Sequence, residues 1–376
     1  MSRLTRVHKG DILFVFGIAL FWRLLLFLPE LLSKDILTQR QGYIGEIPWA
    51  NFDGTHYLSI AKDGYFQYEH VFFPLFPLLI RHIEKLLRIT YLESSLLIVY
   101  ISFLAALFFL YKLSMLDLDR GKARWVLVML LAFPTSFFLA SVYTESLFLA
   151  LSIASFYAAR KKRWVVAGIL GGLASSTRFV GIFLFAAFIL EFLYQNGNKE
   201  SVVSKMKGIA MHAWGVFLIP LALLLHMYYL HRTVGDAFAF IHSQFAFGAN
   251  RSSGEIVLLP QVLFRYANIL LTLPISNYDF WIAFFELVIF SLFLFFLITR
   301  IRTMRISYLV YSFFVVIIPT LSGTLSSEPR YVLAAFPVFL SLSQYVSQQK
   351  KIVIVVLSSF LLFLLTMFFL QGYFIA

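Results

Sequence analysis

The sequence predicts an all-α polytopic membrane protein with about ten or eleven transmembrane helices. Of the 376 residues, 60% are hydrophobic and only 13% are charged, and the mean hydropathy is +0.84. Apolar runs such as Tyr91–Leu110 and Ile352–Leu370 have roughly the 17–25 residues that a helix needs to cross the hydrocarbon core. Backbone polar groups in lipid must be satisfied within the chain, so we expect these runs to be helical.

Basic residues lie in short clusters between the apolar runs, and these clusters predict the topology. The net charge is +12, but the basic residues do not share a surface with exposed aromatic residues, as a nucleic-acid-binding protein requires. Basic loops favour the cytoplasmic side of a membrane. We therefore expect a cytoplasmic N-terminus, retained as a signal anchor. The clusters predicted to be cytoplasmic lie in residues 3–9, 112–124, 160–163, 199–207, 300–305 and 350–351.

The apolar runs and the basic clusters together predict the order of the helices in one transmembrane domain, residues 1–376. The two helices around Thr177 and Arg178 are short for two crossings, and one long kinked helix is the alternative. Charge favours two helices, because the basic clusters on both sides then face the cytoplasm. The predicted helices are 11–32, 91–112, 124–140, 146–160, 164–177, 179–194, 209–230, 281–299, 306–321, 331–347 and 352–371.

Residues 33–90 form the longest predicted extracytoplasmic loop. Connections of this length usually carry function. Asp53, Tyr57 and Ala61 have the spacing of one helix face, and Gly64 lies where a short helix would end. We expect a juxtamembrane helix with Asp53 as its N-cap or in its first turn, where free backbone amides keep the carboxylate ionised. Capping alone is the alternative role for this aspartate.

Four sequence blocks follow one another in the order found in a known family. They are residues 52–65 with 72–77, beginning Phe52-Asp53-Gly54-Thr55-His56-Tyr57, and residues 133–148, 167–181 and 329–337. Together they resemble the PIG-V-type mannosyltransferases of the GT-C superfamily, polytopic enzymes that use lipid-phosphate-linked sugars. The family's Trp-Asp pair appears here as Phe52-Asp53, with Trp49 three residues earlier.

The resemblance implies a membrane glycosyltransferase. It would move a sugar, mannose by the resemblance, from a polyprenyl- or dolichyl-phosphate donor to a glycan or glycolipid acceptor on the extracytoplasmic face, with inversion. The superfamily has its catalytic acid in the first outer loop, which implies Asp53 as the base. Such a transfer also needs cationic groups for the departing phosphate and an apolar groove for the lipid tail.

Arg178 and Arg330 are the predicted ligands of the donor phosphate, because a guanidinium group can hydrogen-bond two oxygens at once. Each lies at an apolar helix end that is predicted to face outside, against the positive-inside bias. A snorkelling side chain or a lipid headgroup contact is the alternative for both.

Further side chains in the predicted outer segments are candidates for binding the substrates. Arg23 lies inside the first apolar run and therefore needs a partner, for which Glu145, Glu286 or the donor phosphate are the alternatives. For Glu145 itself, we expect either binding of sugar hydroxyl groups or pairing with an arginine. The predicted substrate-binding residues are Trp49, His56, Tyr57, Tyr65, Tyr143 and Glu145.

We predict no required metal. Asp53, His56, Asp63, Glu69 and His70 share the first loop, but their spacing matches no helical metal pair such as His-x-x-x-His. Loose binding of Mg²⁺ or Mn²⁺ by such oxygen ligands is the weak alternative. The chain has no cysteine, which excludes thiolate metal sites and cysteine nucleophiles.

Two other functions suit a polytopic chain. A flippase or transporter of lipid-linked sugars usually has two repeated halves, whereas this sequence has one glycine-rich break, residues 171–178, and no matching second half. A glycan polymerase or ligase would share the topology but not the block around Asp53. We expect the plasma (inner) membrane in a prokaryote or the endoplasmic reticulum in a eukaryote, with membrane lipid, donor and acceptor as partners and no nucleic acid.

Overall fold

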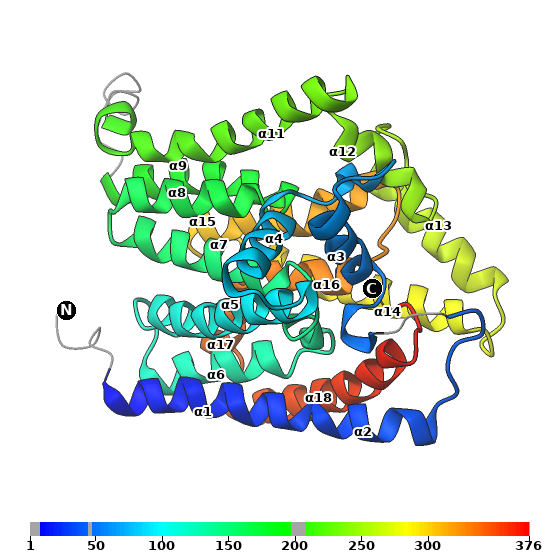
Figure 1. The fold of residues 1–376 in the computed structure, drawn as a ribbon. Coiled ribbons are helices and arrows are strands. Elements are labelled where there is room, and N and C mark those ends of the chain that lie inside the picture. The colour runs from blue at the N-terminus through cyan, green and yellow to red at the C-terminus, as the bar shows by residue number, and fades with distance from the viewer. Residues whose placement is uncertain (1–7, 44–46, 197–207, 376) are drawn as a thin grey trace. The chain divides into compact units, whose positions relative to one another are not determined.

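The computed structural model describes residues 8–43, 47–196 and 208–375, and these residues form helices and no β-strand (Figure 1). Within the described residues, six helices are long and apolar enough to cross a membrane. The prediction of an all-α polytopic membrane protein is confirmed. The six candidate spans are Lys9–Ile36, Tyr91–Ser114, Phe179–Asn196, Trp214–Val234, Tyr278–Thr299 and Gln348–Leu370.

The chain divides into two compact units, each built from separate segments. Unit 1 comprises Met1–Gly64, Pro77–Ala150 and Val338–Ala376, and unit 2 comprises Tyr65–Phe76 and Leu151–Pro337. Unit 1 contains α1 (Lys9–Leu25), α2 (Phe27–Ile36), η1 (Pro48–Ala50), α3 (Asp53–Asp63), α5 (Tyr91–Ser114), α6 (Arg120–Leu131), η3 (Ser136–Leu139) and α18 (Gln348–Leu370). The unit boundaries fall within α4 (Leu75–Leu87) and α7 (Glu145–Arg160) and at the start of α17 (Pro337–Tyr345).

Unit 2 holds the remaining helices. They are η2 (Glu69–Val71), α8 (Trp164–Ser175), η4 (Phe179–Ile182), α9 (Phe183–Asn196), η5 (Trp214–Phe217), α11 (Leu218–Val234), α12 (Ala239–His242), η6 (Ser243–Phe247), α13 (Leu259–Thr272), α14 (Tyr278–Thr299), α15 (Ile306–Ile317), η7 (Pro319–Ser322), α16 (Glu328–Tyr331) and η8 (Val332–Ala334).

In unit 1, α1 packs on α5, and α18 lies along α2 and α6 (Figure 1). Trp22 joins three of these helices, because its ring stacks on Phe103 of α5 at 4.9 Å and its Nε1 donates to the carbonyl of Leu131 in α6 at 2.8 Å. Beside Trp22, an apolar cavity of about 320 Å³ is lined by residues of α1, α2, α6 and α18.

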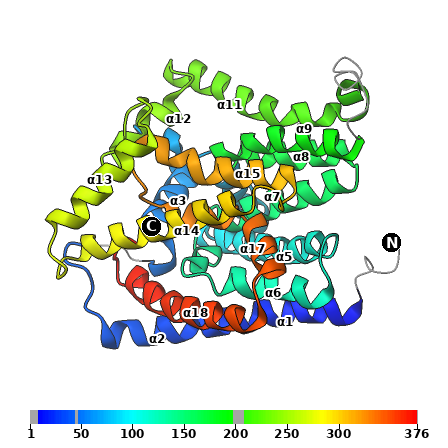
Figure 2. The same cartoon turned by 180° about the vertical axis from the view of Figure 1, so that it is seen from behind.

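In unit 2, α8 packs on α11 and α9 packs on α15 (Figure 2). The first contact depends on glycine: a Cβ atom on Gly168 would lie 1.7 Å from the carbonyl oxygen of Gly215. Small residues allow such close backbone approach between membrane helices. The glycine-rich stretch of the third sequence block is therefore a helix-packing surface.

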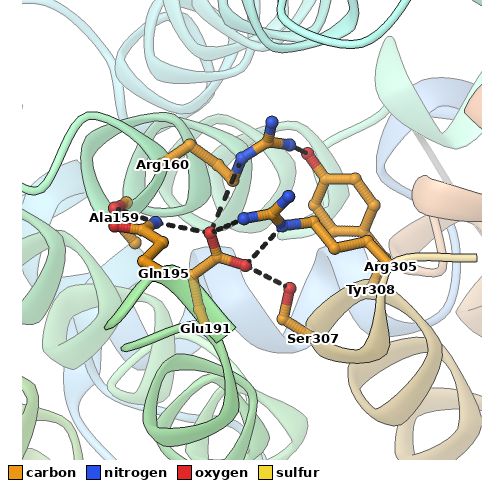
Figure 3. A network of polar contacts seen from close by, with 7 residues as sticks. All are labelled: Ala159, Arg160, Glu191, Gln195, Arg305, Ser307 and Tyr308. Atoms are coloured by element: carbon orange, nitrogen blue, oxygen red, sulfur yellow. Dashed lines mark hydrogen bonds and ion pairs between the residues drawn. The ribbon is translucent and has the colours of Figure 1, made fainter. Parts of the chain in front are cut away.

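A buried ion network joins α7, α9 and α15 within unit 2 (Figure 3). Glu191 of α9 has no exposed surface, and Arg305 donates two hydrogen bonds to its carboxylate, at 2.6 and 2.7 Å. Ser307 and Gln195 donate at 2.7 and 2.5 Å, and Arg160 lies at 3.6 Å. The network satisfies this carboxylate completely, as a buried charge requires.

Two predicted helices are wrong in extent, and proline explains both differences. The prediction of a helix over 124–140 fails because α6 ends at Leu131, shortly before Pro134, and only the short η3 follows. The predicted helix 331–347 is interrupted between η8 and α17, where Pro337 begins the next helix. Proline lacks an N–H group and disfavours helical backbone in the residue before it.

The two helices predicted around Thr177 and Arg178 are separate. Helix α8 ends at Ser175, η4 begins at Phe179 and is followed by α9 at Phe183, and Arg178 between α8 and η4 has extended backbone, with φ −151°. One long kinked helix is therefore excluded.

Candidate active site

Asp53 begins helix α3, and Gly64 ends it with φ 92°, as the sequence predicted. Tyr57 and Ala61 are buried on the inner face of the helix, whereas Asp53 and His56 are half-buried. A carboxylate in the first turn of a helix lies beside backbone N–H groups that have no partner within the helix, and these groups stabilise its ionised form.

The residue before Asp53 has a strained backbone. Phe52 adopts φ 54° and ψ −115°, a conformation that residues other than glycine rarely take. Its ring is held edge-on against Phe374 at 5.4 Å. Strained residues persist only where their surroundings determine them strongly, and they concentrate at functional sites. The strain sets the direction in which α3 starts and so orients Asp53.

Asn51 ties the first sequence block to the second block and to the C-terminal helix. Its side chain is buried and donates to the carbonyl of Phe369 at 2.7 Å, and its own carbonyl accepts from the hydroxyl of Tyr143 at 2.7 Å. The neighbouring Trp49 carbonyl accepts from the N–H of Val142 at 2.9 Å. Sequence reasoning missed Asn51; its place two residues before Asp53 was the available signal.

Gly54, next to Asp53, lies against the same part of the second block. A Cβ atom at this position would lie 3.1 Å from the carbonyl oxygen of Val142. A larger residue would therefore push the start of α3 away from residues 142 and 143. Glycine here keeps Asp53 on the rigid junction of the two blocks.

Arg23 contacts aromatic residues in unit 1, and these were not among the partners that the sequence offered. Its guanidinium donates to the hydroxyl of Tyr100 at 2.8 Å and lies 4.8 Å from the centre of the Trp49 ring. An arginine over an aromatic face is stabilised by the ring's negative charge distribution. Trp49 is mostly buried, so part of its surface is used by this contact.

Tyr143 and Glu145 are both buried in unit 1, with exposed fractions of 2% each. Glu145 begins helix α7, and the Tyr143 hydroxyl is engaged by Asn51. In unit 2, the hydroxyl of Tyr65 donates to the carbonyl of Phe72 at 2.8 Å, and its ring stacks on His70 at 5.1 Å. Substrate binding by these residues stays a prediction, as it does for His56 and Tyr57.

In unit 2, Arg178 and Arg330 lie on the same tyrosine. The Cζ atoms of Arg178 and Arg330 are 5.0 and 5.2 Å from the centre of the Tyr331 ring. Each guanidinium group carries a positive charge and several N–H donors in a planar fork. The pair therefore has the charge and the donors to bind a phosphate group. Sequence reasoning named both arginines but missed Tyr331, which follows Arg330 directly.

The predicted residues thus form two groups. Asp53 and the residues that orient it belong to unit 1, and Arg178 and Arg330 belong to unit 2. Among the described residues, no group of three His, Asp or Glu side chains is arranged to hold a metal ion. Burial lowers the pKa of His70, one of the weak metal candidates. The prediction that no metal is required stays a prediction.

Comparison with known proteins identifies the family. The family model described as Mannosyltransferase (PIG-V) matches residues 29–244, more than half of the chain, and this range includes Asp53 and Arg178. A relative from Rattus norvegicus named GPI alpha-1,6-mannosyltransferase 2 is 28% identical over 240 residues, 58% of this chain and 44% of its own length. The Cricetulus griseus protein of the same name is 32% identical over 167 residues, 41% of this chain and 33% of its own length.

The alignments therefore cover less than half the length of these two relatives. No solved structure matches the chain. The family match covers the first three of the four sequence blocks, of which the first has the most specific motif. The chain belongs to the PIG-V mannosyltransferase family.

Proposed function

We propose that this protein is a mannosyltransferase of the membrane that transfers mannose from a polyprenyl-phosphate donor to a glycan or glycolipid acceptor on the extracytoplasmic face. The membership in the PIG-V family is the observation that carries the proposal. The names of the two relatives, GPI alpha-1,6-mannosyltransferase 2, support a lipid-linked glycan as the acceptor. Family membership also argues against the flippase and transporter alternatives.

In the proposed reaction, Asp53 is the general base. The acceptor oxygen attacks the anomeric carbon of mannose on the side opposite the phosphate, and Asp53 takes the proton from the acceptor hydroxyl as the new bond forms. The bond between the anomeric carbon and the phosphate oxygen breaks, and the configuration inverts. The polyprenyl phosphate leaves with the electron pair of that bond, and Asp53 later returns its proton to water.

The local structure supports this role for Asp53. A general base must hold its direction, and Asp53 follows a strained residue, begins a helix and stands beside a glycine that packs on Val142. Side chains held by packing and by a rigid element keep the productive geometry better than side chains on loose loops. Asp53 is half-buried, so part of the residue is accessible to solvent.

The arginine pair supports the proposed donor. A polyprenyl-phosphate sugar is a phosphodiester, and its phosphate gains negative charge as the sugar departs. Arg178 and Arg330, which both contact the Tyr331 ring, supply two positive charges to the phosphate group. Their stabilisation increases as the bond breaks, which is the requirement for lowering the barrier of the reaction.

The test compares Asp53→Asn with Asp63→Asn in purified, folded protein given a radiolabelled polyprenyl-phosphate mannose. Asp63 lies at the exposed end of the same helix, which makes the second variant a matched control. We expect Asp53→Asn to lose about 100- to 10,000-fold in turnover, the usual contribution of a general base, with donor binding retained. Wild-type turnover by Asp53→Asn would contradict the assignment.

The same preparation tests the donor site by binding. Arg178→Ala should weaken binding of the lipid-phosphate sugar about 10- to 100-fold, because it removes a charged, two-pronged contact. Arg163→Ala, at the exposed start of helix α8, is the matched control and should bind the donor normally. Unchanged donor binding by Arg178→Ala would remove this residue from the site.

A further inference from the structure

Residues 323–330 of unit 2 form a buried segment with little regular structure. It includes two residues with left-handed backbone, Gly323 at φ 98° and Ser327 at φ 70°. Neighbouring segments hold it, since Arg265 donates to the carbonyl of Gly323 at 2.9 Å and Arg251 donates to that of Ser326 at 3.4 Å. Buried irregular backbone is uncommon, and a strained serine within it points to a functional constraint.

Two glutamates are buried at this segment. Glu286 of α14 is 3% exposed and Glu328 of α16 is 1% exposed. Glu286 accepts a hydrogen bond from the hydroxyl of Tyr266 at 2.5 Å and another from the backbone N–H of Ser327. One oxygen of each carboxyl group, Oε1, has no hydrogen-bond partner among the residues that the structure describes. The sequence had offered Glu286 only as a partner for Arg23.

A buried carboxyl oxygen without a donor is costly, so native proteins rarely keep one without a reason. Burial raises the pKa of Glu328, and the negative charge of Glu286 raises it further, so the ionised form of Glu328 is disfavoured as well. Arg251 is the cation that acts on Glu286, and Tyr266 is its hydroxyl donor. Neither group supplies the hydrogen bonds that the two Oε1 atoms lack.

The position of Glu328 in the sequence limits which class of ligand it could bind. It is separated from Arg330 by one residue, Pro329, in the same short helix, and Arg330 lies on the Tyr331 ring with Arg178. Carboxyl oxygens accept hydrogen bonds from hydroxyl groups, whereas arginines donate to phosphate. A ligand that presents hydroxyl groups next to a phosphate group satisfies both sets of residues, and a sugar linked to phosphate is such a ligand.

A divalent cation is the other ligand that carboxylates attract. The described residues offer no third acidic or histidine ligand to go with Glu286 and Glu328. The positive charge of Arg251, which acts on Glu286, further disfavours a bound cation. The observations therefore favour hydroxyl groups over a metal.

We propose that Glu328 and Glu286 bind hydroxyl groups of the transferred sugar and so select the sugar. This inference rests on the proposed function, because it concerns the sugar end of the same lipid-phosphate donor. It adds two residues that lie more than 40 positions beyond the range matched by the family model, residues 29–244.

The test uses donors that lack one hydroxyl group each. Polyprenyl-phosphate mannose and its 2-, 3-, 4- and 6-deoxy forms are compared with the wild type, Glu328→Gln and Glu286→Gln. We expect the wild type to lose at least about 100-fold in kcat/KM on removal of the hydroxyl group that Glu328 contacts, because the carboxyl group is then left unpaired. Glu328→Gln should lose as much on the full donor but show less than about 3-fold further loss with that deoxy donor.

The control variant is Glu255→Gln, whose glutamate is exposed and lies in the same unit. It should keep the wild-type preference among all five donors. Thermal unfolding of each variant identifies any that fails to fold. If Glu328→Gln does not fold, Glu286→Gln tests the proposal independently, and we expect it too to lose sensitivity to one hydroxyl group of the donor. An equal loss on every donor by both folded glutamate variants would overturn the proposal.

Two further outcomes are decisive. If EDTA abolishes wild-type transfer, and added Mg²⁺ or Mn²⁺ restores it for the wild type but not for Glu328→Gln, the glutamates hold a metal and the sugar-binding proposal is wrong. If the wild type transfers no sugar from any polyprenyl phosphate, the proposed function fails and takes this inference with it. A wild type that is active but whose sensitivity to deoxy donors is unchanged in the variants overturns the inference alone.

Discussion

Two buried glutamates of unit 2, Glu191 and Glu328, have opposite surroundings. Glu191 receives hydrogen bonds from Arg305, Ser307 and Gln195 and lies beside Arg160 (Figure 3). Glu328 is almost as deeply buried, but one of its oxygens has no partner within the described residues. The charge that acts on it is the negative charge of Glu286.

The difference separates a carboxylate whose hydrogen bonds are supplied by the fold from a carboxyl group that keeps one unpaired oxygen among the described residues. A fully satisfied polar network rigidifies the helices that contribute to it, here α7, α9 and α15. A half-satisfied buried group lowers stability and persists in native proteins chiefly where function requires it. We therefore expect Glu191→Gln to lose stability but keep its turnover, and Glu328→Gln to lose turnover without losing stability.

The largest expected effect is the loss of stability in Glu191→Gln. This change leaves the charges of Arg160 and Arg305 in a buried site without their carboxylate, and breaking such a pair costs about 3–5 kcal/mol. Thermal unfolding in detergent measures the loss, and turnover per folded molecule should stay at the wild-type level. An unfolding temperature equal to that of Glu255→Gln would show that the network does not stabilise unit 2.

A smaller loss is expected for Arg305→Lys. Lysine keeps the positive charge but cannot make both hydrogen bonds to Glu191 that Arg305 makes at 2.6 and 2.7 Å. We expect a loss of about 1 kcal/mol in the free energy of unfolding, the usual net value of one hydrogen bond. A loss as large as that of Glu191→Gln would mean that geometry, and not charge, dominates the network.

An effect of about the same size but of opposite sign is expected for Glu328→Gln. The pKa of Glu328 in the folded protein lies well above its ordinary value of 4.5, so the folded state binds this proton more tightly than the unfolded state. Its contribution to stability is then complete below pH 4.5 and is lost as the pH rises toward the folded pKa. Glutamine does not ionise and so removes this loss, and we expect the free energy of unfolding to increase by about 1 kcal/mol at neutral pH.

Unfolding of the wild type and of Glu328→Gln between pH 4.5 and 8 tests this prediction. The stability of the wild type should fall with pH more steeply than that of Glu328→Gln, and the two curves should meet at the acidic end. Destabilisation of Glu328→Gln by as much as Glu191→Gln would erase the contrast between the two glutamates.

Helix α3 was predictable because its signals are local. The spacing of Asp53, Tyr57 and Ala61 sets the buried face of a helix, and Gly64 stops it by adopting φ 92°. The separate helices on each side of Arg178 followed from charge in the same way. The interruptions near Pro134 and Pro337 were within reach of the sequence too, but long apolar runs outweighed the prolines in the prediction.

The partners of buried polar residues were not predictable. Arg23 was expected to pair with a carboxylate or the donor phosphate, yet Tyr100, 77 positions later, accepts its hydrogen bond. Several residues have the right chemistry for a buried arginine, and one sequence cannot choose among them. The choice depends on which helix faces bury against each other, and that is a property of the packed helices.

By itself the sequence determined the class of protein, the helix that begins at Asp53 and the residues of the four family blocks, because composition, periodicity and motifs act over short stretches of chain. Only the tertiary structure decided that Asn51 hydrogen-bonds a carbonyl 318 positions away. It also decided that Arg178 and Arg330 share Tyr331, and that Glu191 is satisfied whereas Glu328 is not. Such contacts arise when distant segments exclude water together, and no local pattern records them.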